Sequence, residues 1–158
     1  MFSNNISRTP EPISGWKGFS KCPIWTKLRI LLFTAAASVK GPLSIGRNSV
    51  AAVSSTSYGY FAGGYGDSSY STVDRVDFTN DTATAAPKGP LSTPARYFGS
   101  ASSNTSYGYF GGGPGGPSII DRLDFGNDTA TASPKGNLSN GRYYLAGTGS
   151  DSYGYFIG

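Results

Sequence analysis

The string SYGYF stands at residues 57–61 and recurs at 106–110 and at 152–156, with spacings of 49 and 46 residues. A second string, DR(V/L)DF followed by NDTATA, begins at Asp74 and again at Asp121. Spacing inside each string is constant, whereas the stretches between the strings differ in length by a residue or two. Constant spacing indicates paired strands and variable spacing indicates loops. The chain is therefore a tandem repeat with a period of about 48 residues.

Each repeat is expected to form four short strands separated by turn residues. In the first repeat the expected strands are 48–53, 57–62, 71–78 and 82–86. The expected breaks are Gly63–Gly64, Asn80–Asp81, and the prolines that bound the link to the next repeat, Pro87 and Pro90. Because the strands alternate and no helical period is present, the sequence predicts an all-β fold. Four strands in about 48 residues are typical of a β-propeller blade.

The repeat resembles the kelch repeat, the blade unit of one large β-propeller family. The shared features are a Gly-Gly doublet after an aromatic strand and a following strand that ends in an aromatic residue. They stand at 63–64 and 112–113, and at 73–78 and 120–125. The kelch pattern expects a Trp seven residues later, where this chain has Ala85 and Ala132, which implies thinner packing between blades. The repeats are also similar to tandem kelch-like proteins of marine bacterial and viral genomes.

The register of the repeat reaches back to Thr34, so the kelch-like region is 34–158. Its units are 40–87, 88–134 and a partial unit at 135–158. This makes about 2.5 four-stranded units, whereas a closed propeller has roughly 4–8 blades. The sequence thus predicts an incomplete propeller. The chain is a fragment of a longer protein, or it closes through further copies of itself, or it is only marginally folded.

Residues 1–33 lie upstream of the repeat register and form a basic, non-repeat leader. Lys27 and Arg29, followed by an apolar run and by Ala35 and Ala37, resemble the end of a signal peptide. A disordered leader and a stretch that is not native coding sequence are the alternatives. The apolar run is far shorter than the ~20 residues of a membrane-spanning helix, so no membrane span is expected.

Composition excludes several classes of function. The chain has no His and one Cys, which removes the commonest general base and the commonest metal ligands. The formal net charge of +4 lies in residues 1–39, because residues 40–158 carry eight basic and eight acidic side chains. A neutral repeat region does not favour nucleic-acid binding. We therefore expect no catalytic residue, no metal, no cofactor and no nucleic-acid partner.

Two sets of residues are candidates for ligand binding. One arginine stands ten residues before each SYGYF string: Arg47, Arg96 and Arg142. These arginines either line a ring that binds acidic sugars or phosphate, or each makes one structural ion pair or carbonyl contact per blade. The second set lies in the variable loop 62–73 and comprises Tyr65, Asp67 and Tyr70. Variable loops on a rigid scaffold are where binding usually resides.

The repeated aspartates are the only clustered carboxylates. They are Asp74, Asp77 and Asp81, with their counterparts Asp121, Asp124 and Asp128. Calcium prefers oxygen ligands, but the D-x-D-x-D-G loop of a calcium site is missing. The favoured interpretation is cross-strand pairing with Arg75 and Arg122, together with capping of the Asn80–Asp81 turn.

The expected function is a non-catalytic repeat scaffold that binds a protein or a carbohydrate. The resemblance weakly favours an extracellular or virion-associated adhesin, as part of a larger surface propeller; the localisation itself is unknown. Its partners would include further blades of a longer chain, or copies of the same chain. Two alternatives remain. One is a fragment of a propeller enzyme whose catalytic residues lie outside this chain. The other is an intracellular kelch module that recruits protein partners.

Overall fold

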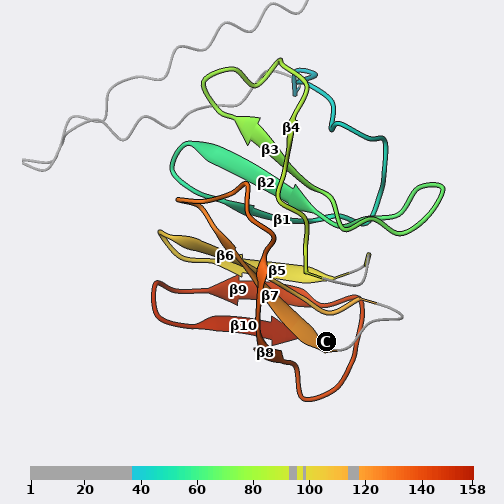
Figure 1. Cartoon of the computed structure of the whole chain (residues 1–158), viewed down its shortest axis with the longest axis vertical. Coiled ribbons are helices and arrows are strands. Elements are labelled where there is room, and N and C mark those ends of the chain that lie inside the picture. Colours follow the sequence, from blue (N-terminus) through green and yellow to red (C-terminus); the bar gives the residue numbers. More distant parts are fainter. Residues whose placement is uncertain (1–36, 93–95, 98, 114–117) are drawn as a thin grey trace, which may run out of the picture. The chain divides into compact units, whose positions relative to one another are not determined.

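The computed structural model describes residues 37–92, 96–97, 99–113 and 118–158. In these residues the chain is all-β, without a helix, and its ten strands form three antiparallel sheets, none of them closed (Figure 1). The all-β prediction is therefore confirmed. The leader predicted at 1–33 lies outside the described residues, as do residues 114–117.

Two of the sheets are four-stranded and follow the sequence order of their strands. The first contains β1 (Ala51–Ser54), β2 (Tyr58–Ala62), β3 (Val73–Asp77) and β4 (Ala86–Lys88). The second contains β5 (Ser100–Ser103), β6 (Tyr107–Gly111), β7 (Ile119–Asp124) and β8 (Ser133–Asn137). A hairpin of β9 (Ala146–Gly149) and β10 (Gly154–Ile157) forms the third sheet.

Equivalent residues of the two repeats occupy equivalent positions in their sheets. Tyr60 lies opposite Arg75 in the β2–β3 pair, and Tyr109 lies opposite Arg122 in the β6–β7 pair. Each SYGYF string supplies one strand, namely β2, β6 or β10. The repeat period of the sequence is thus also the period of the structure. A contact found in one repeat can therefore be compared with the equivalent positions of the next repeat.

The fourth strand is not where the sequence placed it. It was expected at 82–86, but β4 runs over Ala86–Lys88 and the residues before it form a turn. In that turn the Asn80 amide donates to the Asp77 carbonyl at 3.0 Å. Pro87, expected outside the sheet, lies within β4. A proline is accommodated there because β4 is the last strand of its sheet, where a missing N–H can face away from the ladder.

The Gly-Gly doublets end β2 and β6 in a backbone conformation that suits glycine. Gly63 and Gly64 have φ angles of 67° and 110°, and Gly112 and Gly113 have 80° and 117°. A Cβ atom on Gly64 would also lie 2.8 Å from the carbonyl oxygen of Asn48. The doublets are therefore tight turns that need positive φ, as the sequence predicts.

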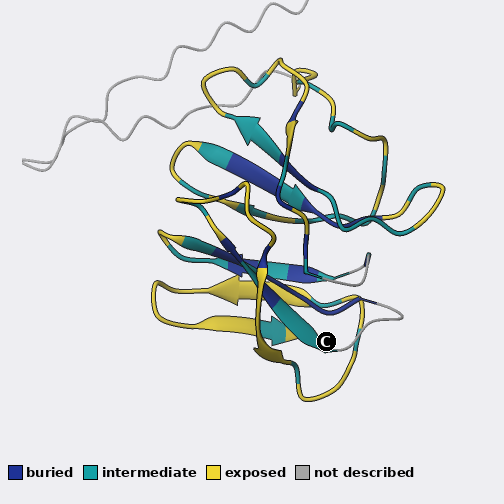
Figure 2. Cartoon of the chain, in the orientation of Figure 1, coloured by how far each residue is buried: buried dark blue, intermediate teal, exposed yellow. Residues whose placement is uncertain are grey.

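The hydrophobic core lies between the two four-stranded sheets. Its buried residues are Tyr60, Ala62, Val73, Leu91, Phe110, Leu123 and Ala132. Strand β5 contacts β1 on one side and β9 on the other (Figure 1). Figure 2 shows the buried positions concentrated in the first two sheets, whereas β9 and β10 are almost wholly exposed. Ala85 and Ala132, which stand where the kelch pattern would have Trp, are buried, with exposures of 3% and 4%.

Candidate functional site

The first candidate arginine, Arg47, is buried in an ion pair. Its Nη1 lies 3.0 Å from Oδ2 of Asp74, and neither side chain has exposed surface. The backbone amide and the hydroxyl of Ser44 also donate to this carboxylate, at 2.9 and 2.6 Å. The guanidinium Nε donates to the Gly63 carbonyl at 2.7 Å. These contacts tie the segment before β1 to β3 and to the Gly-Gly turn.

The second repeat contains the same arrangement. Arg96 forms an ion pair with Asp121, and their side chains are 4% and 0% exposed. The amide and hydroxyl of Ser92 donate to Asp121 at 3.0 and 2.6 Å. Burial lowers the pKa of the Arg96 guanidinium, and the Asp121 carboxylate offsets part of that effect. The structural ion pair, one of the two interpretations of these arginines, is thus the contact that both make.

The repeated aspartates were expected to pair with Arg75 and Arg122. Arg75 does pair with one of them, Asp128, whereas the basic partner of Asp74 is Arg47. Asp74 and Arg75 are adjacent in β3, and adjacent side chains of a strand point to opposite faces. Arg75 instead reaches Asp128 in the next repeat, which is described below.

The remaining aspartates of the first repeat lie at its turn. Asp77 accepts hydrogen bonds from the hydroxyl and the amide of Thr79, at 2.7 and 2.8 Å. These hydrogen bonds lower the pKa of the Asp77 carboxyl. Asp81 pairs with Lys40 at 3.1 Å on the surface. Within the described parts of the chain, no group of three or more acidic or Cys residues could hold a metal ion.

Asp128 anchors the second repeat to the first. Its Oδ2 accepts from the Tyr60 hydroxyl at 3.1 Å and from Arg75 Nη1 at 2.8 Å, and its Oδ1 lies 3.6 Å from Lys88 Nζ. The Asp128 side chain is only 8% exposed. Arg75 in turn lies over the Tyr58 ring, 4.2 Å from its centroid. We call Tyr60, Arg75 and Lys88 the first carboxylate socket.

This socket changes the ionisation of its members. Burial, followed by the negative charge and hydrogen bond of Asp128, raises the pKa of Tyr60 to about 12. Burial opposes protonation of Arg75, but the charge and hydrogen bond of Asp128, together with the charges of Tyr58 and Tyr60, outweigh burial and raise the pKa of Arg75. The protonated phenol and the charged guanidinium are therefore the forms that the folded protein favours.

The third candidate arginine, Arg142, has a different partner. Its Nη1 donates to the Gly158 carbonyl oxygen at 2.6 Å, and the side chain is partly exposed. Arg142 corresponds to Arg47 and Arg96 in the repeat. It forms no ion pair with a carboxylate of the described residues.

The variable loop presents aromatic and acidic side chains at the surface. The Tyr65 ring is 42% exposed and lies 5.0 Å from the Tyr97 ring, at an interplanar angle of 52°. Asp67 is exposed, and Tyr70 is half-buried. We call these four residues the tyrosine loop surface. Tyr97 was not among the residues expected from the sequence. The sequence feature that could have identified Tyr97 is its place directly after Arg96, where the first repeat has Asn48.

Backbone hydrogen bonds fix this loop to the scaffold. Asn48 and Tyr65 exchange two of them, each 2.9 Å long. The Tyr70 amide donates to the Gly64 carbonyl at 2.9 Å, and the Tyr70 carbonyl accepts from the Arg96 amide at 3.1 Å. The candidate loop residues are thus held together, and Arg96 supports them through its backbone while its guanidinium faces Asp121.

The described part of the chain contains no helix that is long and apolar enough to cross a membrane. No protein-family model matches the chain, and no curated protein matches it.

Proposed function

We propose that this chain is a non-catalytic scaffold of kelch-like β-propeller blades, and that it binds a carbohydrate or a protein through the tyrosine loop surface. Two features support kelch-like blades. Each of the two complete repeats forms a four-stranded antiparallel sheet whose strands follow the sequence order. The first strands of successive repeats, β1, β5 and β9, are neighbours, as the inner strands of adjacent blades would be.

The observation that carries the binding proposal is a rigid loop with exposed, mixed chemistry. Tyr65 and Tyr97 form an aromatic pair, and an aromatic pair offers a large apolar face with a polar edge. Such a face can stack on a sugar ring or on an apolar side chain of a protein. Asp67 is exposed beside it and can accept hydrogen bonds from hydroxyl or amide donors. Because the loop backbone is already fixed, binding would cost little ordering entropy.

A glycan array probed with the labelled chain tests the carbohydrate form of this proposal. We expect binding to a limited class of glycans, lost in Tyr65→Ala and weakened in Asp67→Asn. The matched control is Tyr143→Ala, which removes another exposed tyrosine, 55% accessible, outside the loop. Glycan binding that survives Tyr65→Ala would refute the assignment to this surface.

A displayed peptide library tests the protein form with the same three variants. Peptides selected on the wild-type chain should lose affinity with Tyr65→Ala and keep it with Tyr143→Ala. If neither the glycan array nor the peptide library yields a ligand whose binding depends on Tyr65, the tyrosine loop surface is not a binding site.

A further inference from the structure

The repeat contains two kinds of carboxylate site, and both are filled in the first repeat. The inner site consists of a serine and an arginine before the first strand; Ser44 and Arg47 hold Asp74 there. The second kind is the socket in which Tyr60, Arg75 and Lys88 hold Asp128 of the following repeat. Asp74 lies in the third strand of its repeat, and Asp128 lies in the turn after the third strand of the next repeat. We call the third strand and the turn after it the outer half of a repeat.

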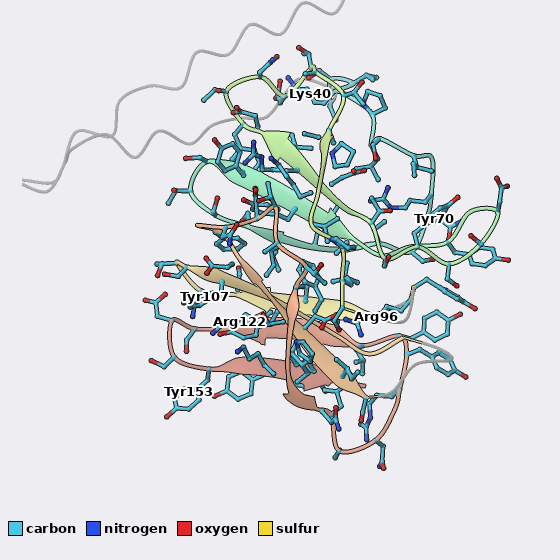
Figure 3. All side chains as sticks on the ribbon, viewed as in Figure 1. Lys40, Tyr70, Arg96, Tyr107, Arg122 and Tyr153 are labelled. Carbon is cyan, nitrogen blue, oxygen red and sulfur yellow. The ribbon has the colours of Figure 1, made fainter. Side chains whose placement is uncertain are left out.

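A second socket is formed by the equivalent residues one period later, Tyr109, Arg122 and Lys135, which all lie on the second sheet. Arg122 lies 4.2 Å over the Tyr107 ring, the same distance that separates Arg75 from the Tyr58 ring. The Tyr107–Tyr109 rings are 6.4 Å apart at 64°, matching 6.4 Å and 69° for the first pair. Figure 3 shows Arg122 and Tyr107 beside each other. The Tyr–Arg part of the second socket thus has the geometry of the first, whereas a register shift between Ile120 and Asp121 alters the pairing of β8, which carries Lys135.

No carboxylate of the described residues occupies the second socket. The Nε atom of Arg122 is buried and makes no hydrogen bond within the described structure. A buried donor without a partner is costly, so it points to a ligand. Tyr109 and Lys135 line a cavity of about 300 Å³ together with Tyr153 and Phe156. The cavity is large enough for an aspartate side chain.

A third inner site stands next to this cavity. Ser139 and Arg142 have the three-residue spacing of Ser44 and Arg47. They line a second hollow with Tyr155 and Phe156 of β10. Arg142 donates there to the Gly158 main-chain oxygen and not to an aspartate of the described residues.

The edge of β10 between these two sites has no strand beside it. Strands β2 and β6 each pair on both edges, whereas β10 pairs only with β9 among the described strands. Tyr155 and Ile157 of β10 are 53% and 68% exposed. A two-stranded hairpin gains stability from a further strand, and its open edge offers unpaired amides and carbonyls.

We propose that this face binds an extended peptide segment of the form D-R-x-D-F-x-N-D-T, the sequence of the outer half of the repeat. Its first aspartate binds Ser139 and Arg142, its strand pairs with β10, and its last aspartate enters the second socket. The proposal concerns a different surface from the tyrosine loop and does not depend on it.

The spacing of charges favours this occupant over an arbitrary acidic peptide. The two aspartates of the segment are seven residues apart in both repeats, as Asp74 and Asp81, and as Asp121 and Asp128. The phenylalanine between them also has a place, because Phe125 stacks on the Tyr60 ring at 5.0 Å and 13°. Tyr109 is the corresponding ring of the second socket. Main-chain pairing would supply affinity, and the two carboxylate sites would supply specificity.

Fluorescence anisotropy tests the proposal with the full chain and a labelled synthetic peptide that has the sequence of Ile119–Asn137. We expect saturable binding, and about tenfold weaker binding when either Asp121 or Asp128 of the peptide is replaced by Asn. In the protein, Arg142→Gln and Lys135→Gln should each weaken binding to a similar extent. Lys40→Gln removes one positive charge in the first repeat and should leave the affinity unchanged.

Sedimentation velocity of the chain, with and without the peptide, shows whether a second copy of the chain competes with the peptide for this face. A monomer that binds the peptide supports the proposal directly. An assembly that the peptide disperses also supports it, with a second copy as the competitor for the same site. No binding of the unsubstituted peptide overturns the proposal, as does equal binding of the peptide with both aspartates replaced.

Discussion

Replacing Asp128 with Asn should destabilise the protein far more than the same replacement at Asp81. The two residues occupy the same position in the same Asn-Asp-Thr-Ala-Thr-Ala turn. The Asp128 side chain is 8% exposed and contacts Tyr60, Arg75 and Lys88. The Asp81 side chain is 39% exposed and pairs with Lys40, itself 51% exposed. The pair of variants therefore compares one substitution in two environments.

The expected magnitudes follow from these burials. Removing one member of a buried ion pair costs about 3–5 kcal/mol, because the remaining charge is left uncompensated. Arg75 is 26% exposed, so water compensates part of its charge, and we expect about 2–3 kcal/mol for Asp128→Asn. An exposed pair contributes about 0–1 kcal/mol, so Asp81→Asn should cost about 0.5 kcal/mol.

Urea unfolding followed by circular dichroism measures the difference. With an m-value of about 1–3 kcal/mol/M, a difference of about 2 kcal/mol separates the two midpoints by roughly 1 M. Tyrosine fluorescence should report the same midpoint if the two repeats unfold together. Equal losses for Asp81→Asn and Asp128→Asn would refute the argument, because the contacts across the repeats would then contribute nothing measurable.

Three further predictions concern stability. Asp121→Asn should cost about 3–5 kcal/mol, since it leaves the buried Arg96 without its carboxylate, whereas Ser92→Ala should cost about 1 kcal/mol; urea midpoints check both. Gly63→Ala should cost about 2 kcal/mol or more, because Gly63 has φ +67° and the new Cβ would overlap the Arg96 carbonyl oxygen. Gly46→Ala, with open space around the new Cβ, should change stability by less than about 0.5 kcal/mol, and similar thermal midpoints for the two variants would contradict this. The raised pKa of Tyr60 predicts that the stability advantage of wild type over Tyr60→Phe is complete below pH 10 and is lost as the pH rises from 10 toward 12. The loss should reach roughly 2–3 kcal/mol, and an advantage that stays constant between pH 9 and 11.5 would count against it.

The sequence was sufficient to predict the strands because their signal is local. SYGYF alternates aromatic and small residues, which suits a half-buried strand, and the Gly-Gly doublet marks the end of that strand. The fourth strand was misplaced because 82–86 has only small and β-branched residues, and their propensity does not show where the turn ends. The contacts of β4 with β3 decide that, and they are tertiary.

The candidate arginines show where a repeated residue is ambiguous. Recurrence alone cannot separate a ligand site from a structural contact, because both recur with the period of the fold. Telling a ligand site from a structural contact requires knowing to which face of β3 Asp74 points. Its neighbour Arg75 points to the opposite face, so these two residues do not pair. The carboxylate of Asp74 pairs instead with Arg47, which comes from the segment before β1, and both side chains are buried.

The contacts between repeats could not be predicted from the sequence, and the reason is physical. Asp81 and Asp128 are identical in their local sequence, yet the first is exposed and the second is enclosed by the preceding repeat. Tyr60 is fully buried, while the equivalent Tyr155 is 53% exposed. The environment of each residue thus depends on which repeat lies beside it, as in other repeat proteins whose stability includes nearest-neighbour terms. For this chain those terms are carried by specific groups, a carboxylate on one repeat and a Tyr–Arg–Lys socket on the one before it. The same reasoning gives the second socket a predicted ligand, which is the D-R-x-D-F-x-N-D-T segment of the repeat itself.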